Sequence, residues 1–266
     1  LNLILRKGGF KMTKNKKSYI KSKFLNYVLP SVAAMWVYTI YTMVDGIFVA
    51  RGVGKEALAA VNISMPLINV AFALGILFAV GASTKASIYK GQNDGKKADR
   101  VFTLSTVTVA CVGLIAAAAV MLNLTNVAKL LGATEETMGY VKSYLGVIIM
   151  FVPFYMTSYN LEVLIKADGF PKKAIKTSLA GAATNIILDA LFVLVFHWGI
   201  TGAAVATGLS QVLTFTVYLR HFLSDRSGFS FVKIRWSAKA AASLAKLGTA
   251  DCVTEISLGV CIFVSN

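Results

Sequence analysis

Two aspartates, Asp45 and Asp189, each lie within a hydrophobic stretch long enough to cross a lipid bilayer. Neither has a basic residue close to it in the sequence. A charged side chain in the hydrocarbon region costs several kcal/mol, so an acid there usually faces a partner, an ion or a water-filled path. Because these acids have no matching intramembrane Lys or Arg, we expect the missing partner to be a mobile cation. The alternative is a structural role, in which hydroxyl or amide groups cap each acid and fix helix packing.

Neighbouring polar residues could complete a cation site with these acids. Asn185 precedes Asp189 by one helical turn, and Tyr41 precedes Asp45 by one turn, so each pair shares a helix face. At about 1.5 Å per residue, Asp45 lies roughly 8 Å from the nearer end of its predicted helix. Asp189 and Thr207 lie roughly 10 Å from the corresponding ends of theirs. If these three helices pack together, two carboxylates, an amide, a hydroxyl and a phenol can meet in one layer. Na⁺ takes several oxygen ligands of this kind, whereas H⁺ needs only one carboxylate, so both coupling ions stay open.

Three further positions in the hydrophobic stretches have predicted roles of different kinds. Glu255 lies among apolar residues near the C-terminus and is a candidate second intramembrane acid. Pro30 lies early in the first hydrophobic stretch, where a proline removes a backbone hydrogen bond and can act as a hinge. Glu162 has Lys166 four residues later on the same helix face, which predicts an ion pair near a helix end.

The chain has few residues suited to catalysis or to metal binding. Cys111, Cys252 and Cys261 lie in apolar surroundings, with neither metal-ligand spacing nor a disulfide pattern. His197 and His221 lie near predicted helix ends. Phosphate-loop, kinase and hydrolase motifs are absent from the sequence. We therefore expect no enzyme, and no cofactor other than the coupling cation.

The composition is typical of a membrane protein. Of 266 residues, 56% are hydrophobic and 15% charged, and the mean hydropathy is +0.68. Soluble domains carry about 25% charged residues. Strand-type alternation is absent, which predicts an all-α membrane protein. The segments long enough to span a bilayer as helices are 24–50, 57–84, 99–123, 138–165, 173–196 and 200–222, and a seventh begins near residue 240.

The basic residues alternate between the two ends of these helices. Of the 27 Lys and Arg residues, only Arg51, Lys55, Lys129 and Lys142 fall on one side. Because positively charged loops favour the cytoplasm, this pattern predicts a cytoplasmic N-terminus. The net charge of +15 does not indicate nucleic-acid binding, since the basic residues lie between apolar runs and not on one exposed face.

The chain is expected to contain one six-helix bundle and the start of another. Residues 1–23 form a basic cytoplasmic segment, 24–223 the six-helix lobe and 224–239 a cytoplasmic linker. Residues 240–266 are the truncated start of a second lobe. This order is typical of a repeated architecture whose second copy is absent, so the chain is expected to be a fragment.

Several stretches, with their spacing, form a recognisable set across about residues 20–266. They are Leu29-Pro-Ser31, Tyr41 to Gly54, Lys90-Gly-Gln-Asn93, Leu131 to Thr134, Ile165 to Pro171, Asn185 to Asp189 and Gly202 to Thr207. Together they resemble the N-terminal lobe of a multidrug and toxic compound extrusion (MATE) transporter. The resemblance implies twelve helices in two six-helix lobes around a central cleft, and export of organic cations in exchange for Na⁺ or H⁺.

The resemblance also implies roles for individual residues. Asp45 matches an acid whose protonation accompanies helix bending at Pro30. Asp189, Asn185 and Thr207 match the cation site of the N-terminal lobe, where Na⁺ would bind.

Tyr41 stands beside that site by the same resemblance, and Glu255 falls where the family often has an acid on helix seven. The sequence departs from the family there, because Gly248-Thr-Ala-Asp251 replaces the usual proline-containing helix start. By the same resemblance, a C-terminal lobe outside the 266 residues is expected to complete the cleft.

The leading hypothesis is a secondary active transporter of a bacterial cytoplasmic membrane. It would exchange Na⁺ or H⁺ for drugs or other small cationic or amphiphilic molecules. One alternative is a flippase of the same superfamily for lipid-linked oligosaccharides or lipid II, which would carry Arg or Lys in the cleft for pyrophosphate. The other is an inactive membrane remnant, because one lobe forms only half of a cleft.

Overall fold

The computed structural model describes residues 32, 36 and 39–265, and the predicted hinge Pro30 lies outside them. The first described helix occupies residues 39–52. The elements that follow are α3 (Lys55–Gly91), α4 (Gly95–Leu122), α5 (Leu124–Leu130), α6 (Glu135–Ala167), α7 (Pro171–Asp189), the π-helix η1 (Ala190–Val195), α8 (Gly199–Phe222) and α9 (Ala238–Ser265). Strands are absent from the described residues, and the predicted all-α membrane bundle is confirmed.

Among the described residues, six helical segments are long and apolar enough to cross a membrane: α3, α4, α6, α7 with η1, α8 and α9. They correspond to the second to seventh predicted helices. All of them begin earlier than hydropathy indicates, and polar caps extend two of them. Asp94 accepts the Lys97 backbone N–H at 3.1 Å at the start of α4, and Thr134 and Thr137 form a capping box at the start of α6. The Lys97 side chain, bonded to Asp94, lowers the pKa of that carboxyl from its usual value.

The short helix α5 was not predicted from the sequence. Its seven residues, Leu124–Leu130, are too few to span a bilayer. Its apolar residues Leu124, Val127 and Ala128 have helical spacing, but the segment is shorter than the window of about 11 residues over which that periodicity is usually recognised.

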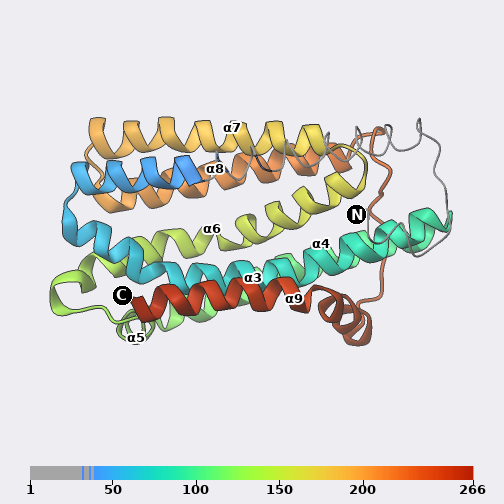
Figure 1. The fold of residues 1–266 in the computed structure, drawn as a ribbon, viewed down its shortest axis with the longest axis horizontal. Coiled ribbons are helices and arrows are strands. Elements are labelled where there is room, and N and C mark those ends of the chain that lie inside the picture. The colour runs from blue at the N-terminus through green and yellow to red at the C-terminus, as the bar shows by residue number, and fades with distance from the viewer. Residues whose placement is uncertain (1–31, 33–35, 37–38, 266) are drawn as a thin grey trace, which may run out of the picture.

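Helix α6 lies at the centre of the bundle (Figure 1) and packs against α3, α4 and α8. Each of the three clusters of buried apolar side chains includes residues of α6. In its most apolar stretch 56% of the residues are buried, against 17% in α9. Helices α3, α4 and α8 are therefore positioned largely by their contacts with α6, whereas α7 packs mainly on α8, and α9 lies at the periphery along α3.

Helices α3 and α9 approach each other closely through two glycines. A Cβ atom on Gly81 would collide with the backbone carbonyl of Leu244, and one on Gly248 would collide with that of Leu77. Small residues allow such approach between membrane helices.

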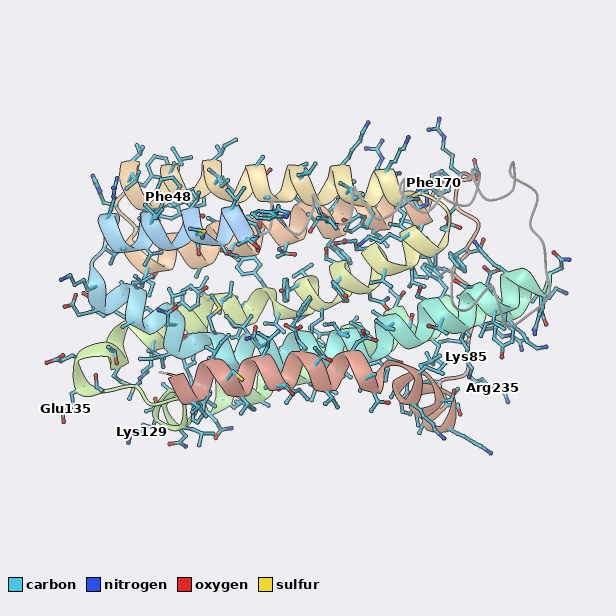
Figure 2. The ribbon with its side chains drawn as sticks, viewed as in Figure 1. Phe48, Lys85, Lys129, Glu135, Phe170 and Arg235 are labelled. Carbon is cyan, nitrogen blue, oxygen red and sulfur yellow. The ribbon has the colours of Figure 1, made fainter. Side chains whose placement is uncertain are left out.

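The two ends of the bundle differ in charge, as predicted. Figure 2 shows Lys85, Phe170 and Arg235 at one end, and Lys129 and Glu135 at the other. We call the first the basic end. Helix α3 ends there at Gly91, and the lysine-rich first turns of α4 and α7 lie beside it. The sequence predicts that the basic end faces the cytoplasm.

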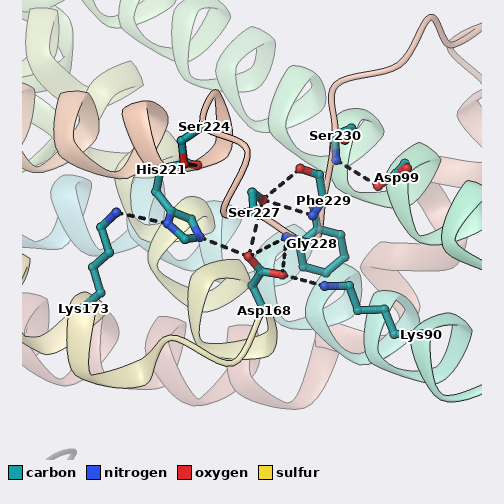
Figure 3. Close-up of polar contacts among 10 residues, drawn as sticks. All are labelled: Lys90, Asp99, Asp168, Lys173, His221, Ser224, Ser227, Gly228, Phe229 and Ser230. Carbon is teal, nitrogen blue, oxygen red and sulfur yellow. Dashed lines mark hydrogen bonds and ion pairs between the residues drawn. The ribbon is translucent and has the colours of Figure 1, made fainter.

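A buried aspartate at the basic end fastens the chain between α8 and α9 to the bundle (Figure 3). The Asp168 carboxylate follows α6 and accepts a hydrogen bond from Lys90 Nζ at 2.6 Å. The backbone N–H of Gly228 donates to both its oxygens, at 3.0 and 3.1 Å. Its Oδ2 lies 3.0 Å from His221 Nε2. Because the Lys173 ammonium can only donate, at 3.0 Å, to His221 Nδ1, the Nε2 atom carries the proton and donates to Asp168.

The predicted linker is therefore attached to the helices along much of its length. Phe229 is 1% exposed and stacks on Phe102 of α4 with ring centroids 5.6 Å apart. The backbone N–H of Ser230 donates to Asp99 at 2.9 Å. Residues 224–239 were predicted as a linker, and the role of Asp168 in holding them was not predicted.

Candidate functional site

The structure brings Asp45 and Asp189 together. Asp45 lies on the helix at 39–52 and Asp189 ends α7, and their carboxyl groups are close enough to interact directly. Asp189 is fully buried, with 0% exposure. Neither carboxylate oxygen of Asp189, nor Oδ1 of Asp45, has a hydrogen-bond partner among the described residues. Asp45 is half-buried, with its Oδ1 atom enclosed, so two acids from separate helices meet beside the buried Asp189 position.

Basic side chains do not compensate this pair within the described part of the chain. The ion pairs there join Lys90 and His221 to Asp168, Lys97 to Asp94, and Lys166 to Glu162. An uncompensated buried charge costs several kcal/mol. The pair of aspartates is therefore suited to holding a proton or a metal cation.

Asn185 and Thr207 join the same layer, as the helix periodicity predicted. The Asn185 Nδ2 atom donates to Thr207 Oγ1 at 3.3 Å, which links α7 to α8. Asn185 also lies beside Asp189, is 1% exposed, and its Oδ1 atom has no partner among the described residues. Because Thr207 uses the amide nitrogen, the amide oxygen remains for another group.

The unpaired atoms of this layer are all hydrogen-bond acceptors. They are Asp45 Oδ1, Asn185 Oδ1, and Oδ1 and Oδ2 of Asp189. A set of oxygens without donors is unfavourable when left alone, and it is the ligand type that hard cations take. The residues present therefore fit Na⁺, and they equally fit a proton shared between the two carboxyl groups.

The end of α7 differs from the prediction of one continuous helix over 173–196. After Asp189 the chain continues as the π-helix η1, a rare form that occurs frequently at functional sites. Phe192 stacks on Trp198 with ring centroids 4.7 Å apart, and a Cβ on Gly202 would lie 3.1 Å from Phe192. This packing against the start of α8 stabilises the wider helical turn of η1.

A cavity of about 580 Å³ extends through the bundle beside this layer. Tyr41 and Asn185 line it, so the predicted neighbours of both acids face the same space. Glu255 of α9, the candidate second acid, also lines it. The other residues that contribute to its wall are Thr39, Phe72, Ile76, Tyr155, Ser158, Tyr159, Glu162, Lys166, Ile175, Ser178, Gly181, Ala182, Ser210, Gln211 and Thr214.

The ion pair predicted between Glu162 and Lys166 is confirmed, with Lys166 Nζ 2.6 Å from Glu162 Oε1. The location of the pair was not predicted. Both side chains line the cavity, whereas the sequence indicated only a position near a helix end. Spacing of four residues shows that two side chains share a helix face, but not which neighbours that face meets.

Comparisons with a family model, with curated relatives and with solved structures all indicate the same family. The family model described as MatE matches residues 30–191. The chain is 26% identical over 253 residues to the multidrug export protein MepA of Staphylococcus saprophyticus, covering 94% of this chain and 56% of the relative. MepA of Staphylococcus aureus matches at the same identity and coverage. The chain thus spans about half the length of these relatives.

Solved structures share the fold. The outward-facing conformation of a multidrug resistance MATE family transporter of the MOP superfamily superposes with a TM-score of 0.82 at 24% identity, covering 90% of this chain and 53% of that one. The MATE multidrug transporter DinF-BH in complex with R6G gives a TM-score of 0.81 at 26% identity, covering 91% and 55%. Because the family model matches more than half of its residues, the chain belongs to the MatE family of multidrug and toxic compound extrusion transporters and is an integral membrane protein.

Proposed function

We propose that the protein is a cation-coupled antiporter that exports small organic cations and amphiphiles across the bacterial cytoplasmic membrane, with its N-terminus in the cytoplasm. The observation that carries this proposal is the buried layer of four unpaired acceptor oxygens on Asp45, Asn185 and Asp189. A structural role would be expected to satisfy these atoms with donors, as Asp168 is satisfied at the basic end.

In this mechanism Asp189, Asn185 and Asp45 provide the oxygens that would hold the coupling ion. Thr207 orients the Asn185 amide through its hydrogen bond. A bound cation supplies the positive charge that the layer lacks, and it biases the protein toward whichever conformation binds it better. Neutralised acids attract a cationic substrate less, which favours its release.

Three further residues have proposed roles around this layer. Tyr41 lies beside the acids on the cavity wall, and Glu255 supplies a second acidic position from α9. Pro30, outside the described residues, is proposed as the hinge of the first helix. A C-terminal lobe would complete the cleft, since the chain spans 56% of the length of its MepA relatives.

The substrate class is supported by the names of similar proteins and by the charge of the cavity. The relatives are named multidrug export proteins, and the DinF-BH structure is described as a complex with R6G. Among the described residues that line the cavity, the carboxylates of Glu162 and Glu255 face one ammonium, that of Lys166. This balance favours cations, and it disfavours the pyrophosphate of a lipid-linked flippase substrate.

The test is export from proteoliposomes that contain the purified protein. With ethidium as substrate, we expect transport when a Na⁺ gradient or a pH gradient is imposed, and none when both are absent. The gradient that drives transport identifies the coupling ion. Equal ethidium flux with and without gradients would contradict coupling, and no flux under any gradient would contradict export by this chain.

A further inference from the structure

The Glu162–Lys166 pair lies within the cavity and apart from the layer of Asp45 and Asp189. Both residues belong to the last turns of α6, toward the basic end. The side chains are 23% and 39% exposed, respectively, so neither is sealed in the protein interior. An ion pair that faces a cavity can open when a ligand offers a better partner to one of its members.

The two members are held very differently. The Oε2 atom of Glu162 accepts the Ser178 hydroxyl of α7 at 3.1 Å. Ser178 Oγ lies 2.9 Å from Tyr218 Oη, and the Tyr218 hydroxyl donates to the Ala174 carbonyl at 2.9 Å. The carboxylate is therefore held from the neighbouring helix α7 through Ser178, in addition to its bond with Lys166.

Lys166 has no comparable support. Among the described residues, the hydrogen bond of its ammonium group is the one to Glu162 Oε1 at 2.6 Å. The Lys side chain is long and flexible, and it can place its charge in water at the helix end while its stem stays packed. Displacement of Lys166 thus leaves the position of Glu162 unchanged.

The surroundings of Glu162 suit a cation with an aromatic or apolar body. The Phe72 ring packs against Tyr155 with centroids 5.1 Å apart and against Tyr159 at 4.7 Å, and all three line the cavity. Glu162, Glu255 and Tyr159 line the same cavity. Aromatic faces beside carboxylates attract organic cations more than neutral molecules of the same shape.

We propose that Glu162 is a binding site for an organic ammonium or phosphonium group, and that Lys166 occupies this site as an internal counter-ion until the ligand displaces it. The proposal rests on the substrate class proposed above. It adds a specific position, on α6 and toward the basic end, that is separate from the coupling layer. Lys166 then sets the affinity of the site by competing with the ligand.

Equilibrium binding of tetraphenylphosphonium to the purified chain in detergent tests this proposal. Lys166→Met is expected to tighten binding about two- to fivefold, the size set by loss of a partly exposed pair at i and i+4. Glu162→Gln, which keeps an acceptor for Ser178, is expected to weaken binding about tenfold. In the double variant Lys166→Met should no longer tighten binding, because the carboxylate for which it competes is absent.

Controls separate charge from folding and from coupling. Neutral triphenylphosphine oxide should bind all variants alike, and Lys166→Arg should resemble the unaltered chain. Lys97→Met removes the lysine of another ion pair, with Asp94, that lies outside the cavity, and it should leave binding unchanged. Weaker or unchanged binding in Lys166→Met, with its unfolding temperature preserved, would overturn the proposal.

The experiment also distinguishes this proposal from the proposed transport function. Binding is measured without any gradient, so a failure of cation coupling leaves its result intact. In the Asp189→Asn background the two- to fivefold effect of Lys166→Met should persist. Its disappearance there would assign the effect to the coupling layer and would overturn a separate site at Glu162.

Discussion

Cells that express the Asp189→Asn variant from the protein's own gene are expected to lose drug resistance down to the level of cells without the protein. Asn has the size of Asp and cannot carry its charge, so the variant removes the cation partner while preserving packing. Asp189 is fully buried, and no other described acid except Asp45 shares its position. The measurement is ethidium accumulation in energised cells. Resistance that stays within twofold of the unaltered protein would eliminate the coupling role of Asp189.

The same variant is expected to fold at least as well as the unaltered protein. Removing one of two adjacent buried carboxyl groups relieves an uncompensated charge. The unaltered protein should instead gain stability from its coupling cation, by about 2.7 kcal/mol when the cation is present at 100 times its dissociation constant. Unfolding temperature measured against Na⁺ concentration and against pH should therefore show a cation dependence that Asp189→Asn lacks.

Asp94→Asn is the matched control for both measurements. Asp94 is also an aspartate and also lies near a helix terminus, but it caps α4 at the surface and pairs with Lys97 at 2.7 Å. Asn is an equally good helix cap, so we expect little change in folding. Loss of resistance in this control would show that the assay responds to any altered aspartate.

Asp168→Ala is expected to cause the largest loss of stability of any single substitution considered. The Asp168 and His221 side chains are each 1% exposed. Removing the carboxylate leaves the Lys90 ammonium, His221 Nε2–H and the Gly228 backbone N–H without their acceptor. Breaking a buried pair by deleting one partner costs about 3–5 kcal/mol. The unfolding temperature in detergent should fall accordingly.

Two variants test the origin of that loss. Asp168→Asn keeps an acceptor oxygen and is expected to lose less stability than Asp168→Ala. Asp99→Ala removes the acceptor of the Ser230 N–H at the more exposed end of the same linker, and it should lose about 1 kcal/mol. If Asp168→Ala and Asp99→Ala proved equally stable, the Asp168 cluster would not be the main attachment of the linker.

The layer formed by Asp45, Asn185, Asp189 and Thr207 could be anticipated because it depends on properties that a sequence contains directly. Hydropathy gives the depth of Asp45 and Asp189, and the helical period gives the face that Asn185 shares with Asp189. Side chains at equal depth on neighbouring helices can then contact one another. The structure places Asp45, Asp189, Asn185 and Thr207 as this reasoning predicts.

The features that were not anticipated depend on which helices lie beside each other. The Asp168 cluster joins α3, α6, α8 and the linker, and hydropathy contains no information on that lateral order. The same holds for the position of Glu162 and Lys166 in the cavity, although their spacing predicted the pair itself. The π-helix after Asp189 depends on the contact of Phe192 with Trp198 and Gly202, which is also tertiary.

The attachment of residues 224–236 has a mechanical consequence. A polar join between helical bundles is normally the most compliant part of a membrane protein and the first to be cut by proteases. Here Gly228 is fixed to Asp168, Val232 N–H donates to Thr103 at 3.1 Å, and Trp236 Nε1–H donates to Thr108 at 3.2 Å. The linker is therefore fixed to α4 and to the end of α6. We expect movement of α9 to be transmitted to these two helices, because the linker between α8 and α9 cannot extend freely.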